Sequence, residues 1–213
     1  MRSRAPLKIA SGGHKRQSIL IIMNVYDVAA ALIAGGASSR MCCDKALLPV
    51  VWHEQQVPLW RRQLFVLESL HPDELILSGP SRDDMPSSLV VLADRIAGKG
   101  ALGGIATCLG HVKSNWLVVV AVDLPRIDAD FLRELMRQRQ DTGVVPVRNG
   151  RFEPLAAVYP KTASAVANKR LERGDLKLQT FVAELIGLGL VRAWNVPEDM
   201  EGCLVNWNLP QVM

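Results

Sequence analysis

The feature that most constrains the fold is an apolar run, Val28–Ala34, which leads directly into a loop rich in glycine, serine and positive charge. The loop reads Gly35-Gly36-Ala37-Ser38-Ser39-Arg40, and Lys45 follows closely. Because glycine lacks a Cβ, its backbone N–H groups can approach phosphate oxygens closely, and successive amides form an anion-binding concavity. Arg40 and Lys45 add positive charge. We therefore expect a buried strand that ends at a phosphate-binding loop.

This loop differs from the two best-known phosphate-binding motifs. No Gly-Lys-Ser/Thr follows at the spacing of a P-loop, and the glycines lack the spacing of the dinucleotide fingerprint. The alternative is that a Gly-Gly-Ala-Ser-Ser sequence after a strand is only a flexible connection. Lys45, placed within a longer ordered signature, favours phosphate binding over that alternative.

Further strand-like and helix-like segments alternate along the chain. The strand-like apolar runs span residues 28–34, 75–78, 89–93, 116–122 and 144–147. Segments with helical spacing span residues 58–69, 128–140 and 161–173, with a shorter one at 103–111 and Asp128 as a predicted N-cap. This alternation predicts one α/β domain, with a mainly parallel sheet and helices on both faces.

Acidic residues follow two of the later strands. Asp94 comes after the run that ends at Ala93, and Asp123 comes after the run that ends at Val122. Ligands of open α/β sheets bind outside the carboxyl ends of the strands, so we expect both residues near the glycine loop. Mg²⁺ commonly takes one or two carboxylates beside phosphates and water, which makes Asp123 a candidate ligand. In the alternative interpretation Asp123 only forms a turn, and Asp94 pairs with a nearby arginine, Arg95 or Arg82.

Composition excludes several function classes. Five of the 25 basic residues precede the first acidic residue, Asp27, so the rest of the chain has 20 basic against 21 acidic residues. A nearly neutral body gives little support for nucleic-acid binding. No apolar run approaches the roughly 20 residues of a membrane span, so no membrane partner is expected. The four cysteines have neither disulfide nor zinc spacing, which suggests a reducing cytoplasm.

The domain boundaries follow from the same charge pattern. Residues 1–24 are predicted to be a basic N-terminal extension, and residues 25–213 the folded domain. The extension is rich in arginine and lysine and has no acidic residue, as in a transit peptide. A second interpretation is that translation begins at Met23 and the preceding residues are an added segment.

The ordered motifs resemble a known family. Gly35-Gly36-x-Ser38-x-Arg40-Met41, followed by Asp44-Lys45-Ala46, resembles the signature of the molybdenum cofactor guanylyltransferases, within the larger group of Rossmann-like nucleotidyltransferases. Four further stretches occur in the family's order, and the resemblance covers roughly Val25 to the C-terminus. These stretches are Leu92–Asp94 before Gly100–Ile105, Val122–Pro125, Glu153–Leu155 and Asn206–Pro210.

The resemblance implies a Rossmann-like fold and a reaction. In that reaction the terminal phosphate of molybdopterin cofactor attacks the α-phosphate of Mg·GTP, which yields the guanine dinucleotide and pyrophosphate. The residues implied as catalytic are Lys45, Arg40 and Asp123, with Asp123 also holding Mg²⁺. The residues implied to bind the nucleotide are Ile33, Ala34, Gly35, Gly36, Ser38, Lys45, Asp94 and Asp123.

The resemblance also implies partners. Asn206 and Asn208 are implied to bind the acceptor, and two positions apart they share one face of an extended segment. The alternative is that they stabilise a turn before Pro210. Molybdoenzymes or other proteins of cofactor biosynthesis are the candidate protein partners.

Rival functions remain open at this point. Glycine at position 36 resembles the guanine-using branch, whereas related cytidylyltransferases more often have alanine-glycine there, so the choice of GTP depends on that distinction. A transferase that uses CTP or a sugar phosphate is the enzymatic rival. A non-catalytic nucleotide-binding regulatory protein is the rival from another class.

Cys42-Cys43 is the clearest departure from the family, which usually has glycine after Arg-Met. Positive charge from Arg40 and Lys45 favours the reactive thiolate form of a nearby cysteine. We predict that alkylation of Cys42 or Cys43 inhibits the enzyme and that bound Mg·GTP protects it. Peptide mapping of the modified thiols, combined with an activity assay, tests this. Full activity after modification of both thiols would place this segment outside the site.

Overall fold

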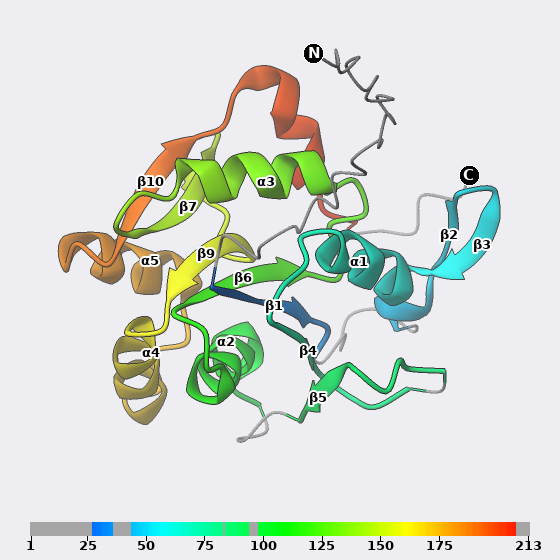
Figure 1. The fold of residues 1–213 in the computed structure, drawn as a ribbon. Helices are drawn as coiled ribbons and strands as arrows, with labels where there is room; N and C mark the ends of the chain where they lie inside the picture. Colours follow the sequence, from blue (N-terminus) through cyan, green and yellow to red (C-terminus); the bar gives the residue numbers. More distant parts are fainter. Residues whose placement is uncertain (1–26, 36–43, 83, 94–97, 208–213) are drawn as a thin grey trace, which may run out of the picture.

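A computed structural model describes residues 27–35, 44–82, 84–93 and 98–207 of the 213-residue chain. The strands of its main sheet are β1 (Val28–Ile33), β4 (Glu74–Ser78), β5 (Val90–Leu92), β6 (Trp116–Ala121), β7 (Gly143–Arg148), β8 (Arg151–Phe152), β9 (Ala156–Pro160) and β10 (Val191–Asn195). Their order in the sheet is β10-β7-β9-β6-β1-β4-β5, with β8 paired to β7. Figure 1 shows this sheet at the centre of the molecule.

The helices cover both faces of the sheet. They are α1 (Leu59–Glu68), α2 (Gly100–His111), α3 (Ala129–Gln138), α4 (Ala163–Glu172) and α5 (Leu178–Gly187). In addition to these α-helices there are two short 3₁₀ helices, η1 (Lys45–Leu47) and η2 (Glu198–Leu204). Buried residues of α1 and α3 belong to one apolar core, and those of α2, α4 and α5 belong to the other (Figure 1).

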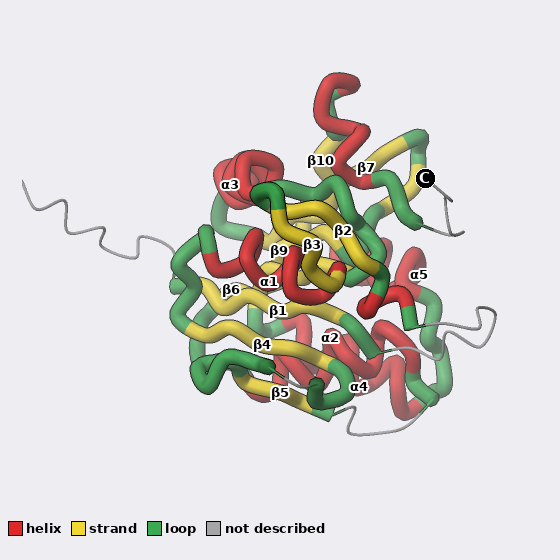
Figure 2. Tube along the Cα trace, turned by 90° about the vertical axis from the view of Figure 1, so that its right-hand side faces the viewer, coloured by secondary structure: helices red, strands yellow, loops and turns green. Residues whose placement is uncertain are grey.

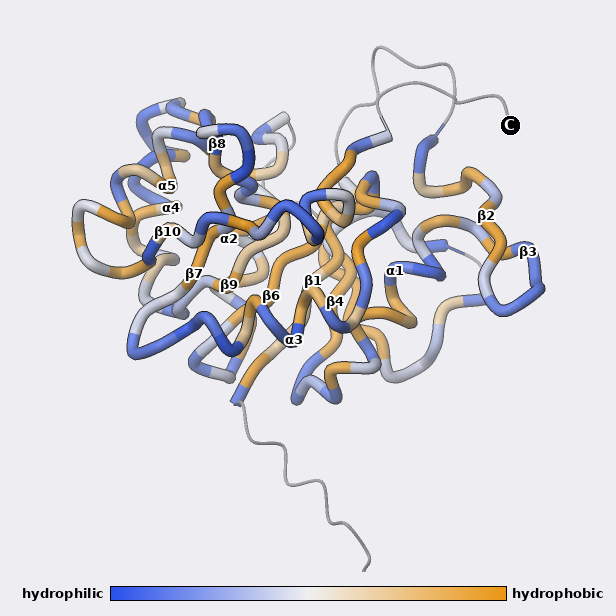
Figure 3. The backbone as a smooth tube through the Cα atoms, turned by 90° about the horizontal axis from the view of Figure 1, so that it is seen from above, coloured by the Kyte–Doolittle hydropathy of each residue, from blue (hydrophilic) through white to orange (hydrophobic). Residues whose placement is uncertain are grey.

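Strand β1 shows why both faces need covering. All six of its residues are buried. Val28, Ala30 and Leu32 belong to the core beneath α1 and α3, whereas Ala29, Ala31 and Ile33 belong to the core beneath α2. Successive side chains of a strand point to opposite faces, so a continuous apolar run can only be buried between two layers. The hydropathy colouring in Figure 3 shows hydrophobic residues in β1 and in its neighbour β6.

The sheet is mainly parallel. Strand β1 pairs in parallel with β4 and with β6, and β5 extends the parallel set beyond β4. Strand β9 runs antiparallel between β6 and β7, and β10 pairs in parallel with β7. The predicted fold class is therefore confirmed, with two reversed strands, β8 and β9, that the apolar runs did not reveal.

A separate hairpin lies beside α1. It consists of β2 (Pro49–Trp52) and β3 (Gln55–Pro58), joined by a tight turn in which His53 and Glu54 both have positive φ. The Trp52 ring lies beneath the guanidinium of Arg62 from α1, with 4.9 Å between the Arg62 Cζ and the ring centroid. Figure 2 shows the hairpin as a unit apart from the main sheet. The apolar runs of the sequence did not indicate this hairpin.

The predicted helices are confirmed with adjusted ends. Asp128 is the N-cap of α3, as expected, because its Oδ1 accepts the Phe131 N–H at 2.8 Å. Helix α2 begins three residues before the predicted Gly103, and α5 was not predicted. Within the described ranges, no helix has the length and apolarity that crossing a membrane requires. The predicted extension, residues 1–24, lies outside the described residues.

Gly143 marks a point where the sheet leaves no room for a side chain. A Cβ added there would meet the Val158 carbonyl oxygen, with Pro160 Cδ at 2.8 Å and Val191 Cγ1 at 2.9 Å. We predict that Gly143→Ala lowers the free energy of unfolding by about 2–3 kcal/mol, because strands β9 and β10 must shift. Urea unfolding followed by circular dichroism measures the change.

The matched control is Gly187→Ala at the end of α5, where an added Cβ meets nothing within 4 Å. Alanine favours a helix over glycine, so this variant should be stabilised by about 0.5–1 kcal/mol. Equal unfolding midpoints for the two variants would contradict the packing described for Gly143.

Candidate functional site

The site begins where β1 ends between its two neighbours. Ala34 N–H donates to the Ser78 carbonyl at the end of β4 at 2.8 Å, and Val122 N–H donates to the Ile33 carbonyl at 3.0 Å. Figure 2 shows β1 lying between β4 and β6. The chain leaving β1 is therefore held from both sides at the carboxyl edge of the parallel strands.

Gly79 allows the chain after β4 to pack directly on this backbone. Its φ is +152°, and an added Cβ would lie 2.9 Å from Ala34 C and 3.0 Å from Gly35 N. A side chain at position 79 would therefore push away the start of the glycine loop. The close approach explains why glycine occupies this position.

Asp44 organises the short helix that follows the glycine loop. Its Oδ1 accepts the Ala46 N–H at 3.0 Å and so caps η1. Ala46 is fully buried in the core beneath α1 and α3, which fixes the turn against the body of the protein. Lys45 is therefore carried on an anchored segment.

Lys45 reaches across to Asp123, 78 positions later in the chain. Lys45 Nζ donates to Asp123 Oδ2 at 3.3 Å, and the two side chains are 18% and 26% exposed. A partly exposed ion pair of this kind contributes about 0–1 kcal/mol to stability. This weak contact is easily broken by a ligand whose anionic groups bind Lys45 and whose cation binds Asp123.

The loop that carries Asp123 is fastened to α1. Gln63 is fully buried, and its Nε2 donates to the Leu124 carbonyl at 2.7 Å. Arg62 Nη1 donates to Gln63 Oε1 at 2.7 Å and also to the Ile127 carbonyl. Burial lowers the pKa of the Arg62 guanidinium, an effect opposed by the nearby Asp128 carboxylate and Cys203. Removing Gln63 would leave buried polar groups without partners.

The C-terminal segment returns to the same place. Trp207 N–H donates to the Asp123 backbone carbonyl at 3.0 Å. This hydrogen bond brings Asn206, which is exposed, beside the loop that carries Asp123. Half-burial, with the Asp128 carboxylate as a second cause, raises the pKa of the nearby Cys203 thiol.

The Glu153-Pro154-Leu155 stretch borders the site on the other side. The Leu155 carbonyl accepts the Ala121 N–H at 2.7 Å, so this stretch is attached to the end of β6. Arg148 Nε and Nη2 both donate to Glu153 Oε1 at 3.1 Å. The fully buried Tyr159 donates its hydroxyl to the Pro154 carbonyl at 2.8 Å, and burial raises its pKa.

The structure brings together the predicted site residues that it describes. Ile33, Ala34 and Gly35 lie at the end of β1, with the Lys45–Asp123 pair and Asn206 at the same edge. Five predicted site residues lie outside the described residues, as do Cys42 and Cys43. These five are Gly36, Ser38, Arg40, Asp94 and Asn208, and Arg95, the alternative partner of Asp94, lies outside as well.

Sequence reasoning missed the residues that hold the site in place. Gly79 follows an apolar run directly, so its position after a strand was an available signal. Gln63 carried no such signal, because a glutamine at a helical position is normally solvated. Arg82 was considered only as a partner for Asp94, whereas its guanidinium pairs with Asp44 at 2.8 Å.

The donor set fits a cation that arrives with a ligand. Over the residues with described positions, no group of three or more His, Cys, Asp or Glu could hold a metal ion. Asp123 offers a partly exposed carboxylate at the end of β6. A hard divalent cation commonly combines one or two carboxylates with substrate phosphates and water. The site therefore fits metal bound to a polyphosphate and not a preformed protein cage.

Comparison with known proteins agrees with this geometry. Residues 30–188 match the family described as the MobA-like NTP transferase domain. A relative from Opitutus terrae, named a probable molybdenum cofactor guanylyltransferase, is 34% identical over 193 residues, which cover 88% of this chain and 94% of the relative. A second, from Carboxydothermus hydrogenoformans and with the same name, is 30% identical over 87% of this chain and 93% of its own.

Solved structures show the same fold. Molybdopterin-guanine dinucleotide biosynthesis protein A from Archaeoglobus fulgidus superposes with a TM-score of 0.64 at 21% identity, over 85% of this chain and 93% of its own. 2-C-methyl-D-erythritol 4-phosphate cytidylyltransferase from Thermus thermophilus superposes with a TM-score of 0.60 at 16% identity, over 85% of this chain and 93% of its own. At these identities the likeness concerns the fold alone, which is common to proteins named for different nucleotides.

Proposed function

Because the chain belongs to the MobA-like NTP transferase domain family, we propose that it transfers GMP from GTP to the terminal phosphate of molybdopterin cofactor. The observation that carries the proposal is the Lys45–Asp123 pair, which places a cation and a carboxylate side by side where the glycine loop leaves β1. The names of the two relatives support the choice of guanylyl transfer. We place the activity in the cytoplasm, on the cysteine pattern of the sequence.

The reaction requires positioning more than covalent help from the protein. An oxygen of the acceptor phosphate attacks the α-phosphorus of GTP, and a new P–O bond forms. The bond from the α-phosphorus to the bridging oxygen breaks, and pyrophosphate leaves with that electron pair. Negative charge shifts toward the leaving group, so cations fixed near it stabilise the transition state.

Lys45 is proposed to stabilise the negative charge that develops on the leaving pyrophosphate. Its backbone is anchored through η1 and the buried Ala46, so its ammonium is already near the place where charge develops. Arg40 would add a second positive charge from the same loop. The backbone of residues 33–36 and the hydroxyl of Ser38 would bind the nucleotide, with Asp94 as a further nucleotide contact.

Asp123 is the residue proposed to hold Mg²⁺. Its backbone carbonyl is fixed by Trp207, and the following residue is fixed by Gln63, while its carboxylate makes a weak contact with Lys45. When bound, the ion would neutralise phosphate charge and align the triphosphate. Asp123 thus combines a fixed backbone with a side chain that is free to change partner.

The acceptor side is proposed to include Asn206 and Asn208. The hydrogen bond from Trp207 N–H to the Asp123 carbonyl supports this assignment, because it holds Asn206 beside the loop that carries Asp123. An asparagine amide offers two donors and one acceptor, which suits the polar edge of a pterin. Molybdoenzymes or other proteins of cofactor biosynthesis would receive the product.

The test replaces each member of the pair separately. We predict that Lys45→Ala and Asp123→Ala each reduce pyrophosphate release on the order of 100-fold or more, by analogy with other electrostatic stabilisers. Both variants should remain folded, because this partly exposed pair contributes only about 0–1 kcal/mol to stability. Pyrophosphate release with GTP and acceptor, alongside thermal unfolding, measures the two effects.

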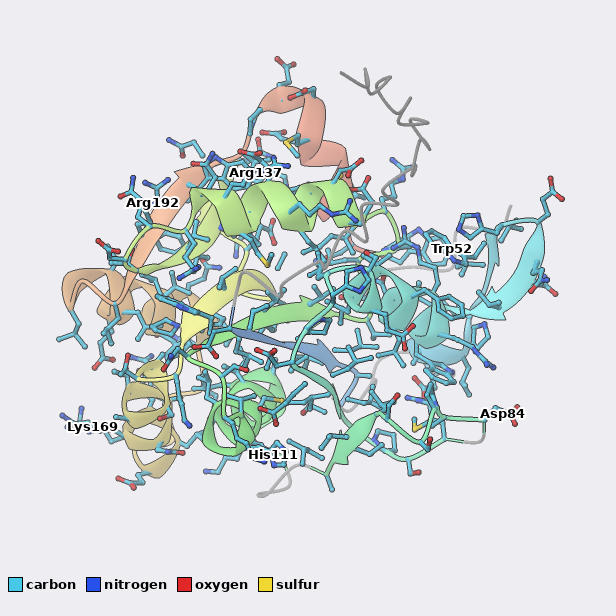
Figure 4. The ribbon with its side chains drawn as sticks, in the orientation of Figure 1. Trp52, Asp84, His111, Arg137, Lys169 and Arg192 are labelled. Atoms are coloured by element: carbon cyan, nitrogen blue, oxygen red, sulfur yellow. The ribbon has the colours of Figure 1, made fainter. Side chains whose placement is uncertain are left out.

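Lys169→Ala and Asp130→Ala serve as matched controls. Lys169 is exposed on α4, as Figure 4 shows, and the Asp130 side chain is 90% exposed. Both control variants should release pyrophosphate at the wild-type rate. Wild-type turnover by folded Lys45→Ala and Asp123→Ala would overturn the catalytic assignment, and absence of turnover in the wild type would favour a nucleotide-binding regulatory protein.

A further inference from the structure

Arg82 pairs with Asp44 beside the site, but this contact uses only one of its three guanidinium nitrogens. It lies in the loop between β4 and β5, and its side chain is only 9% exposed. Its Nη1 donates to Asp44 Oδ2 at 2.8 Å. Its Nε and Nη2 are shielded from solvent and have no hydrogen-bond partner among the residues that the structure describes. Leaving charged donors buried without partners is costly.

The two unpartnered nitrogens form one edge of the guanidinium. In arginine, Nε–H and one Nη2–H point in the same direction, so together they can donate two parallel hydrogen bonds. This fork matches two oxygens of a phosphate, and such paired charge-assisted hydrogen bonds are among the strong ones in proteins. The edge left open at Arg82 therefore has the chemistry of a phosphate-binding group.

The position of Arg82 connects this edge to the nucleotide site. Its loop begins at Gly79, which packs on the backbone of Ala34 and Gly35. Its guanidinium reaches Asp44, the residue immediately before Lys45. The β4–β5 loop thus contacts the chain both at the end of β1 and at the start of η1. Figure 4 marks Asp84 farther out on the same loop.

We propose that Arg82 is a phosphate-binding residue of the nucleotide site, with its Nε and Nη2 donating to an oxyanion of the triphosphate while Nη1 holds Asp44. This inference rests on the proposed function, whose nucleotide it contacts. The triphosphate is favoured over the acceptor's phosphate because Arg82 adjoins the segment that carries Lys45. No covalent step is assigned to Arg82.

The experiment measures binding of inorganic tripolyphosphate with Mg²⁺ by isothermal titration calorimetry. We expect Arg82→Gln to weaken this binding about tenfold or more, since hydrogen bonds to charged groups are worth roughly that much. The tripolyphosphate affinity of Arg82→Lys should lie between those of the wild type and Arg82→Gln, because lysine keeps the charge but lacks the paired N–H donors. Guanosine, which has no phosphate, should bind both variants as it binds the wild type.

Asp44→Asn separates phosphate binding from a purely structural role. Asparagine retains an oxygen that can accept the Ala46 N–H, while the ion pair with Arg82 is lost. If Arg82 binds phosphate itself, Asp44→Asn should bind tripolyphosphate at least as tightly as the wild type. Weakening equal to that of Arg82→Gln would overturn the proposal, because Arg82 would then act only by holding Asp44.

Two further controls complete the design. Arg137→Gln removes an exposed arginine that pairs with Glu134 on α3, away from the β4–β5 loop (Figure 4), and should bind tripolyphosphate like the wild type. Wild-type tripolyphosphate binding by folded Arg82→Gln would overturn the proposal. A raised KM for the pterin acceptor in that same variant would assign Arg82 to the acceptor's phosphate instead.

The outcome for Arg82 is separable from that of the proposed function. Tripolyphosphate carries no base, so the contrast between Arg82→Gln and Asp44→Asn does not depend on which nucleotide the enzyme uses. If the contrast holds but GTP supports no transfer, the guanylyl assignment fails and the phosphate assignment stands. Should Arg82→Gln unfold, Arg82→Lys carries the test, with wild-type affinity as the contradicting result.

Discussion

The parallel pairing of β1 with both β4 and β6 is the constraint on which the site depends. In this register Ile33 lies beside Ser78 on one side and Ala121 on the other, so three strands end together. The residues that follow them must then share one small region. Gly79 packs on Ala34, and Asp123 approaches Lys45, only because the strands end at the same level. A shift of one residue in either pairing would separate these groups.

The site combines a firmly held backbone with weakly held side chains. Hydrogen bonds from Gln63 and Trp207 fix the chain around Asp123, and Asp44 caps the turn that carries Lys45. The side-chain contact between Lys45 and Asp123, at 3.3 Å and partly exposed, is weak by comparison. Such an arrangement suits a charged substrate, because both charged groups are already in place. Little free energy is lost when Lys45 and Asp123 give up their mutual contact and bind ligand atoms instead.

Much of the architecture could be predicted because apolar runs and loop residues carry local signals. The run from Val28 to Ile33 is buried on both faces, as an unbroken apolar strand must be. Strand β9 was missed because its direction depends on pairing with β6 and β7, which local sequence does not encode. Helix α5 and the β2–β3 hairpin were also missed. The two hairpin strands have no buried residue, and α5 buries only Phe181, Val182 and Leu185.

The functional residues divide in the same way. Asp123 could be predicted from its place after an apolar strand, and the structure puts it beside Lys45. Gln63, Trp207 and Arg82 could not, because their roles arise from contacts between segments far apart in the chain. The roles of Arg40, Ser38, Asp94 and Asn208 stay predictions from the sequence, since these positions lie outside the described residues.

The measurement that tests the central claim most directly is thermal unfolding of the wild-type protein with Mg²⁺ and each of the four nucleoside triphosphates in turn. A ligand at 100 times its Kd stabilises the folded state by about 2.7 kcal/mol, which for a chain of this size shifts the Tm by roughly 5–10 °C. We predict such a shift in Tm with GTP and a clearly smaller one with CTP, ATP or UTP. An equal or larger shift with CTP, or no shift with any nucleotide, would contradict it.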